Sequence, residues 1–147
     1  MNLVFDPDPP YIEGDWLDPR TWGCELPYNS FCIDWDKKLF AIVDHEDYDW
    51  ALQWVWHVTK SRTESNLYVT RNTRLQGKTG PQVKLYLHKE ILKRSFQLPP
   101  TPNHIVGDHI NGNSLDNRRK NLRWATFSEN AENRWRCHRL KKQGIQP

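Results

Sequence analysis

The chain has 147 residues, of which 37% are hydrophobic and 12% aromatic, and its formal net charge is +3. This length suits one ordinary domain or two small units that share a core. No apolar run reaches the length of a transmembrane helix, and the N-terminus lacks the basic-then-apolar pattern of a signal peptide. We therefore expect a cytoplasmic protein with no membrane partner.

The charge is distributed unevenly along the chain. Residues 1–50 hold 12 acidic and 3 basic side chains, whereas residues 51–147 hold 6 acidic and 18 basic ones. A basic surface attracts the phosphates of nucleic acids, and an acidic one repels them. A nucleic-acid face is therefore expected on the later two-thirds of the chain and not on the first third.

Residues 1–36 are predicted to form an acidic N-terminal arm, rich in proline and aromatic residues. Five prolines rule out long regular elements, and the tryptophans argue against plain disorder because such side chains favour burial. The preferred interpretation is an ordered, irregular arm whose acidic face is solvated. The alternative is that the arm shields the basic surface or mimics DNA until it is displaced.

Residues 37–97 are predicted to form a small β-rich region. Short apolar or alternating runs indicate strands, and polar residues that precede helical patterns indicate caps. The expected elements are a strand over 39–43, a helix over 46–53 capped by Asp44, strands over 54–58, 66–71 and 83–87, and a helix over 88–94. Together they predict a small antiparallel sheet that carries short helices.

Residues 98–147 are predicted to form a strand, a loop, a second strand and a helix. Asn111-Gly112 is a strong turn signal, and Leu122–Ala125 alternates like a short strand. Thr126 and Glu129 have the spacing of a capping box, so the helix is expected to begin there. Phe127, Ala131 and Trp135 are spaced by four, and we expect this stripe to pack on the hairpin.

Four polar side chains should meet in this unit. Asp108 and His109 end the first strand, Asn121 follows Asp108 by thirteen residues, and Asn130 follows it by twenty-two. Asn130 lies three residues after Phe127, so it can sit beside the stripe and face the site. Taken singly, each residue has a plainer explanation, as a hairpin turn or an ordinary cap. Together, at the spacing of the nuclease family that this stretch resembles, they favour a catalytic site.

The same stretch resembles the His-Asn-His (HNH) nuclease family, in the version found in phage and intron homing endonucleases. The resemblance rests on Asp108-His109-x-Asn111-Gly112, Leu115–Arg119, Asn121-Leu122-Arg123-x-Ala125-Thr126 and Asn130, and covers about 30 residues. It implies an α+β protein in which a small antiparallel sheet region precedes a ββα-metal finger, with Asn as the third signature residue. It also implies a phage or bacterial intracellular setting.

The resemblance implies a metal-dependent DNA endonuclease. His109 would be the general base that activates water, since a neutral imidazole is a good base near neutral pH. Asp108 and Asn130 would hold one Mg²⁺ or Mn²⁺, because hard oxygen ligands suit those ions better than zinc. Asn121 would hold the His109 loop in place. The three cysteines lack paired Cys-x-x-Cys spacing, so no zinc is expected.

Basic side chains in three places are expected to contact double-stranded DNA. Those in the loop and the C-terminal helix would grip phosphates, and those on the sheet would follow a groove. They are Arg118, Arg119, Lys120 and Arg123 in the loop, Arg134 and Arg136 in the helix, and Arg71, Arg74 and Lys84 on the sheet. The alternative for the sheet is a solvated face without a partner.

Two other functions remain open, together with nicking versus double-strand cleavage and the oligomeric state. One is a non-catalytic DNA-binding protein in which the finger is structural, and the other is a non-specific nuclease in phage defence or packaging. A second Asp-His pair, Asp44-His45, is followed by Asn66 at the same spacing of twenty-two residues, but Asn66 falls outside any predicted helix, position 57 is histidine and no Asn-Gly turn follows. We interpret it as a helix cap and an exposed neighbour, and we interpret His88 as a structural residue.

Overall fold

The computed structural model describes residues 29–34, 36–61, 66–75 and 78–147. Most of the predicted acidic arm, including Cys24, lies outside these residues. The elements in chain order are β1 (Ser30–Asp34), β2 (Leu39–Ile42), α1 (His45–Ala51), β3 (His57–Lys60), β4 (Leu67–Arg74), β5 (Gln82–Tyr86), α2 (Leu87–Arg94), β6 (Val106–His109), the 3₁₀ turn η2 (Arg119–Asn121), β7 (Leu122–Ala125) and α3 (Phe127–Lys142).

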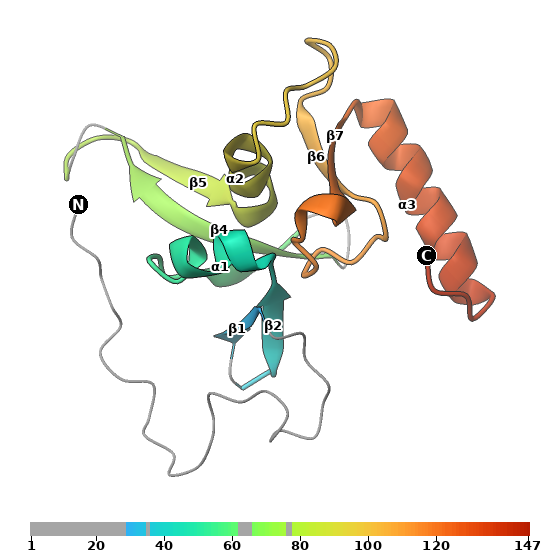
Figure 1. Cartoon of the computed structure of the whole chain (residues 1–147), viewed down its shortest axis with the longest axis horizontal. Helices are drawn as coiled ribbons and strands as arrows, with labels where there is room; N and C mark the ends of the chain where they lie inside the picture. Colours follow the sequence, from blue (N-terminus) through green and yellow to red (C-terminus); the bar gives the residue numbers. More distant parts are fainter. Residues whose placement is uncertain (1–28, 35, 62–65, 76–77) are drawn as a thin grey trace.

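The strands form small antiparallel sheets, so the described chain is a mixed α and β structure, as expected. There are three sheets among the described residues (Figure 1). The first pairs β1 with β2, the second is a meander in the order β3, β4, β5, and the third pairs β6 with β7. Antiparallel neighbours can be joined by short hairpins and need no crossover helix. The short predicted strands and the turns between them in the sequence are consistent with this arrangement.

Helix α2 lies at the centre of the apolar core. Its residues Leu87, Ile91 and Leu92 are fully buried, and the helix contacts β4 and β5 on one side and β6 and β7 on the other. Val69 of β4 and Leu122 of β7 belong to the same core cluster. The meander and the β6–β7 hairpin are therefore held together through one short amphipathic helix.

Several sequence-based boundaries were wrong. The last residues of the predicted irregular arm form β1, because Phe31 pairs with Ala41 and both are buried. The strand predicted over 54–58 begins only at His57, since Trp56 instead buries its ring and donates from Nε1 to the carbonyl of Ala51. Leu87 begins α2 rather than ending β5.

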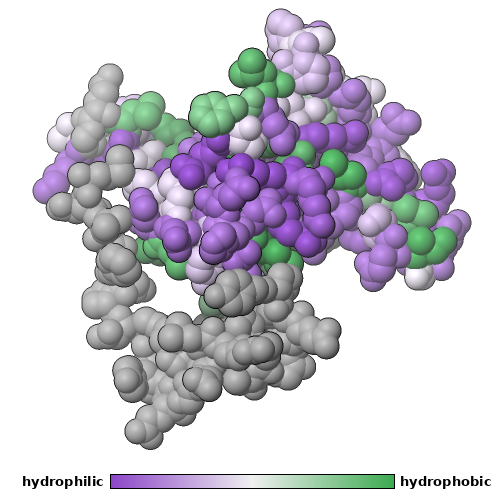
Figure 2. Space-filling model, viewed as in Figure 1, coloured by the Kyte–Doolittle hydropathy of each residue, from purple (hydrophilic) through white to green (hydrophobic). Residues whose placement is uncertain are grey.

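The long loop between β6 and β7 is docked on β2 and α1. Ile42 donates to the carbonyl of Leu115 at 2.9 Å and accepts from the amide of Asn117 at 2.7 Å. Asp44, predicted to cap α1 through its side chain, instead accepts the backbone N–H of Arg119 at 2.7 Å. Figure 2 shows hydrophilic residues gathered over this junction of α1 and η2.

No helix in the described parts of the chain is both long and apolar enough to cross a bilayer.

Candidate active site

The β6–β7 hairpin and α3 build the site. In the antiparallel register Asp108 lies opposite Arg123 and His109 opposite Leu122, so the Asp-His pair ends β6 beside the loop. Helix α3 starts at the predicted capping box, in which Thr126 accepts from the N–H of Glu129 and Glu129 accepts from the N–H of Thr126. This cap fixes where α3 leaves the hairpin.

The face that α3 turns to the hairpin is not the predicted one. Phe127 and Trp135 are 70% and 76% exposed, whereas Asn133 and Cys137 are buried. The segment is a helix, as the spacing of its apolar residues predicted. The face that it buries is nevertheless a polar one, because Asn133 hydrogen-bonds the end of β6. The expectation that the stripe packs on the hairpin was therefore wrong.

Asp108 is buried and held from two directions. Its Oδ2 accepts from Arg123, with Nε at 2.9 Å and Nη2 at 2.8 Å. Asn133 Nδ2 lies 3.2 Å from each carboxylate oxygen and 3.0 Å from the carbonyl oxygen of His109. A carboxylate buried this way needs such donors, because an unpaired buried charge is costly.

His109 is buried next to Asp108, and one of its ring nitrogens is hydrogen-bonded. Nε2 lies 3.1 Å from Oδ1 of Asn117. Burial lowers the pKa of His109 below its ordinary value, although the Asn117 hydrogen bond and the nearby carboxylates oppose the shift. A neutral imidazole is thereby favoured near neutral pH, as a general base requires.

A second buried histidine packs on the first. The rings of His88 and His109 meet edge to face with centroids 4.9 Å apart, and Tyr68 lies against both rings. Burial, and then the charge of His109, hold the pKa of His88 well below its ordinary value. Gly107 lets the ring approach β6, because a Cβ there would lie 2.4 Å from Cδ2 of His88.

Asn121 ties together the loop that follows His109. Its Oδ1 accepts from the N–H of Asn111 at 3.0 Å, and its Nδ2 donates to Oδ1 of Asn111 at 3.0 Å and to the carbonyl of Asp116 at 2.8 Å. Every polar atom of this buried amide is paired. The loop is thereby closed on itself directly beside the Asp-His pair.

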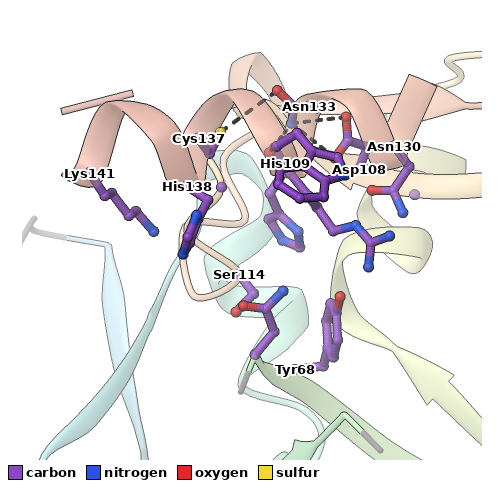
Figure 3. A pocket seen from close by; sticks show the side chains of 14 residues that line it. Tyr68, Asp108, His109, Ser114, Asn130, Asn133, Cys137, His138 and Lys141 are labelled. Carbon is purple, nitrogen blue, oxygen red and sulfur yellow. Dashed lines mark hydrogen bonds between the residues drawn. The ribbon is translucent and has the colours of Figure 1, made fainter. Parts of the chain in front are cut away.

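Asp108 and His109 line a cleft of about 630 Å³ between β4, β6 with the loop that follows it, and α3. Helix α3 adds several polar and basic side chains to this lining, namely Asn130, Asn133, Arg134, His138 and Lys141. Figure 3 shows Tyr68 facing Asp108 and His109 across the opening, with Asn130 next to Asp108. The predicted base and both predicted metal ligands thus line the same cleft.

The donor set fits a hard divalent cation with few protein ligands. Asp108 supplies a carboxylate and Asn130 an amide oxygen, and Mg²⁺ commonly takes one or two protein oxygens and completes its shell with water and phosphate. Within the described residues there is no group of three or more His, Cys, Asp or Glu side chains that could enclose a metal.

Several predicted DNA contacts are engaged inside the protein. Arg118 pairs with Asp116, Arg119 with Asp47 and Glu46, and Arg123 with Asp108. Arg136 donates to Asn133 and to the carbonyl of Ile110, and Arg71 stacks on Trp54. Lys120, Arg74 and Lys84 are exposed, and Arg134 lines the cleft.

Comparison with known proteins identifies the same segment. Residues 97–132 match the family model described as HNH endonuclease, and this range contains Asp108, His109, Asn121 and Asn130. The match supports the HNH family, and with it a nuclease that acts on nucleic acid. No curated protein and no solved structure matches the chain.

The sequence reasoning missed two buried asparagines that contact the site. Asn117 touches His109, and Asn133 touches both Asp108 and His109. Asn133 could have been found, since it lies three residues after Asn130 and four before Cys137 on one helical face. Asn117 lies within the Leu115–Arg119 part of the family resemblance, but no local pattern predicts its contact with His109, because only the docking of its loop on β2 turns its side chain inward.

Proposed function

We propose that this protein is a metal-dependent endonuclease that hydrolyses phosphodiester bonds in double-stranded DNA. The proposal is carried by one observation: Asp108, His109 and Asn130 line a single cleft together with basic side chains of α3. The HNH endonuclease match over residues 97–132 supports it independently.

In the proposed reaction His109 takes a proton from a water molecule, whose oxygen bonds to phosphorus while the bond to the 3′ oxygen breaks. The leaving oxygen takes a proton from solvent, which gives 3′-hydroxyl and 5′-phosphate ends. Asp108 and Asn130 would hold the divalent ion, which supplies charge stabilisation at the phosphate and the leaving oxygen when bound. Asn121 keeps the loop beside His109 closed.

The meander offers a DNA-facing surface next to this cleft. Tyr68, Asn72 and Arg74 alternate on one face of β4, and the register places Lys84 opposite Asn72 and Gln82 opposite Arg74 on that face. Tyr68 also lines the cleft. We propose that Arg74 and Lys84 contact DNA here, whereas Arg71 points to the other face, toward Trp54 and Trp56.

Plasmid nicking by the purified protein tests the proposal. Mg²⁺ or Mn²⁺ should support cutting, a chelator should stop it, and His109→Ala should lower the rate by at least about a hundredfold, as loss of a general base does. His45→Ala is the matched control, because exposed His45 follows an aspartate in the same way but lies outside the cleft. Equal rates for His109→Ala and wild type would refute the assignment.

One observation favours a second candidate, a DNA-binding protein without nuclease activity. The carboxylate of Asp108 is satisfied by the guanidinium of Arg123 and the amide of Asn133, without a metal ion. Salt-sensitive DNA binding, with no cutting of random-sequence or genomic DNA in either metal, would favour this candidate. A footprint would then show whether the protein protects a defined site.

A further inference from the structure

Asn117 lies in the loop between β6 and η2 and is only 1% exposed. Its backbone N–H donates to the carbonyl of Ile42 at 2.7 Å, next to the bridge between Ile42 and Asp116. The loop is therefore anchored on β2, far from His109 in the sequence. This anchoring fixes the position from which the Asn117 side chain reaches the site.

The orientation of the Asn117 amide follows from its second contact. Nδ2 donates to the carbonyl of Leu115 at 3.0 Å, and a carbonyl oxygen can only accept. The amide nitrogen must therefore face Leu115, which leaves Oδ1 facing Nε2 of His109 at 3.1 Å. A flipped amide would lose the hydrogen bond to Leu115 and set Oδ1 against its carbonyl oxygen.

This orientation decides which nitrogen of His109 carries the proton. Oδ1 can only accept, so Nε2 must be the N–H donor in the neutral ring, and Nδ1 keeps its lone pair. In the other tautomer the lone pair of Nε2 would face a lone pair of Oδ1. Both side chains are buried, so water could not readily separate them. The contact thus distinguishes between two forms that are otherwise close in energy.

We propose that Asn117 is a positioning residue that holds His109 in the Nε2-protonated tautomer, so that Nδ1 is the atom that takes the proton from water. This role rests on the proposed endonuclease function. After the transfer, the imidazolium still donates from Nε2 to Asn117, so the hydrogen bond is kept throughout the step. The ring therefore need not rotate during the reaction.

The tautomer can be read directly from imidazole nitrogen shifts in a two-bond proton–nitrogen correlation spectrum of the ¹⁵N-labelled, metal-free full chain. The spectrum is taken at a pH where His109 is neutral, and comparison with His109→Gln assigns its signals. Wild type should show a protonated Nε2 and an unprotonated Nδ1. A protonated Nδ1 in wild type would overturn the proposal, whatever the variants do.

Two substitutions then test the role of the contact. Asn117→Leu removes the acceptor, so the His109 signals should shift toward a mixture of tautomers and kcat should fall about tenfold or more with little change in KM. Asn117→Asp keeps an acceptor, so it should restore the tautomer and recover much of the rate. An unchanged tautomer and rate in folded Asn117→Leu would overturn the proposal.

The two readouts separate this inference from the proposed function. If wild-type His109 holds the expected tautomer but the protein cuts no DNA, the nuclease function fails and the catalytic role of Asn117 fails with it. If the protein cuts DNA through His109 while the ring carries its proton on Nδ1, the nuclease stands and Asn117 is not its positioning residue. The exposed His45 should give unchanged signals in both variants.

Discussion

Arg123 and Asp108 face each other across the β6–β7 ladder and form an ion pair at the carboxylate proposed to bind the metal. The guanidinium donates through Nε and Nη2 to the same oxygen, Oδ2, whereas the donor to Oδ1 among the described residues is Asn133, at 3.2 Å. A cation and Arg123 therefore compete electrostatically for one carboxylate. DNA phosphates would draw Arg123 away, so metal and DNA should bind cooperatively.

Arg123→Gln should strengthen Mn²⁺ binding in the absence of DNA. Removing a positive charge beside the site is expected to tighten binding about tenfold, which corresponds to about 1.4 kcal/mol. Calorimetric titration of the metal-free protein measures this. Lys120→Gln removes the same charge away from the carboxylate and is the control. Equal affinities for Arg123→Gln and wild type would refute the competition.

Asn130→Ala and Asn133→Ala should fail in different ways. Asn130 is half-buried and lines the cleft, so its loss should weaken Mn²⁺ binding and nicking with little effect on thermal stability. Asn133 is buried on Asp108 and His109, so its loss leaves unsatisfied acceptors and should cost about 1–3 kcal/mol of stability. Thermal melts and metal titrations of both variants test this. A large loss of stability in Asn130→Ala, with unchanged stability in Asn133→Ala, would contradict the two assignments.

The protein should lose stability as the pH falls below about 6.5, the ordinary pKa of histidine. Burial lowers the pKa of both His88 and His109, so the unfolded chain binds protons more readily than the folded one. Their contribution is complete above that pH and declines toward their folded pKa values, by up to about 1.4 kcal/mol per pH unit for each group.

His88→Phe should flatten this pH dependence, because it keeps a ring beside His109 but cannot be protonated. Urea denaturation at pH 7.5 and pH 5 measures the difference in stability. The exposed His45→Ala variant should behave like wild type. A His88→Phe protein with the full wild-type pH dependence would show that His88 contributes nothing to it.

Arg119→Ala should destabilise the fold rather than merely weaken DNA binding. Arg119 pairs with Asp47, whose side chain is fully buried, and Arg94 is a second basic partner among the described residues. We expect a loss of about 3 kcal/mol, since a buried carboxylate loses its closer cation. Lys120→Ala should leave stability unchanged and reduce the salt dependence of DNA binding by about one phosphate contact. The opposite pattern would place Arg119 on the DNA.

Local sequence signals determined the parts of the fold that depend on neighbours in the chain. The capping box at Thr126 and Glu129 set the start of α3, and the Asn-Gly turn ended β6 within reach of its partner strand. Short-range chemistry also predicted that Asp108 and His109 lie side by side at a strand end. These features follow from backbone preferences and spacing, which the sequence states directly.

Only the tertiary structure decided what these residues touch. The apolar stripe of Phe127 and Trp135 remained exposed because α3 buries Asn133 against a carboxylate, and helical periodicity does not say which face wins when both could pack. The sequence predicts Arg119 to be a DNA contact, but in the fold α1 brings Asp47 beside it and the two side chains pair. Asn117 reaches His109 because β2 anchors its loop, and such long-range pairing depends on the whole chain rather than on any local pattern.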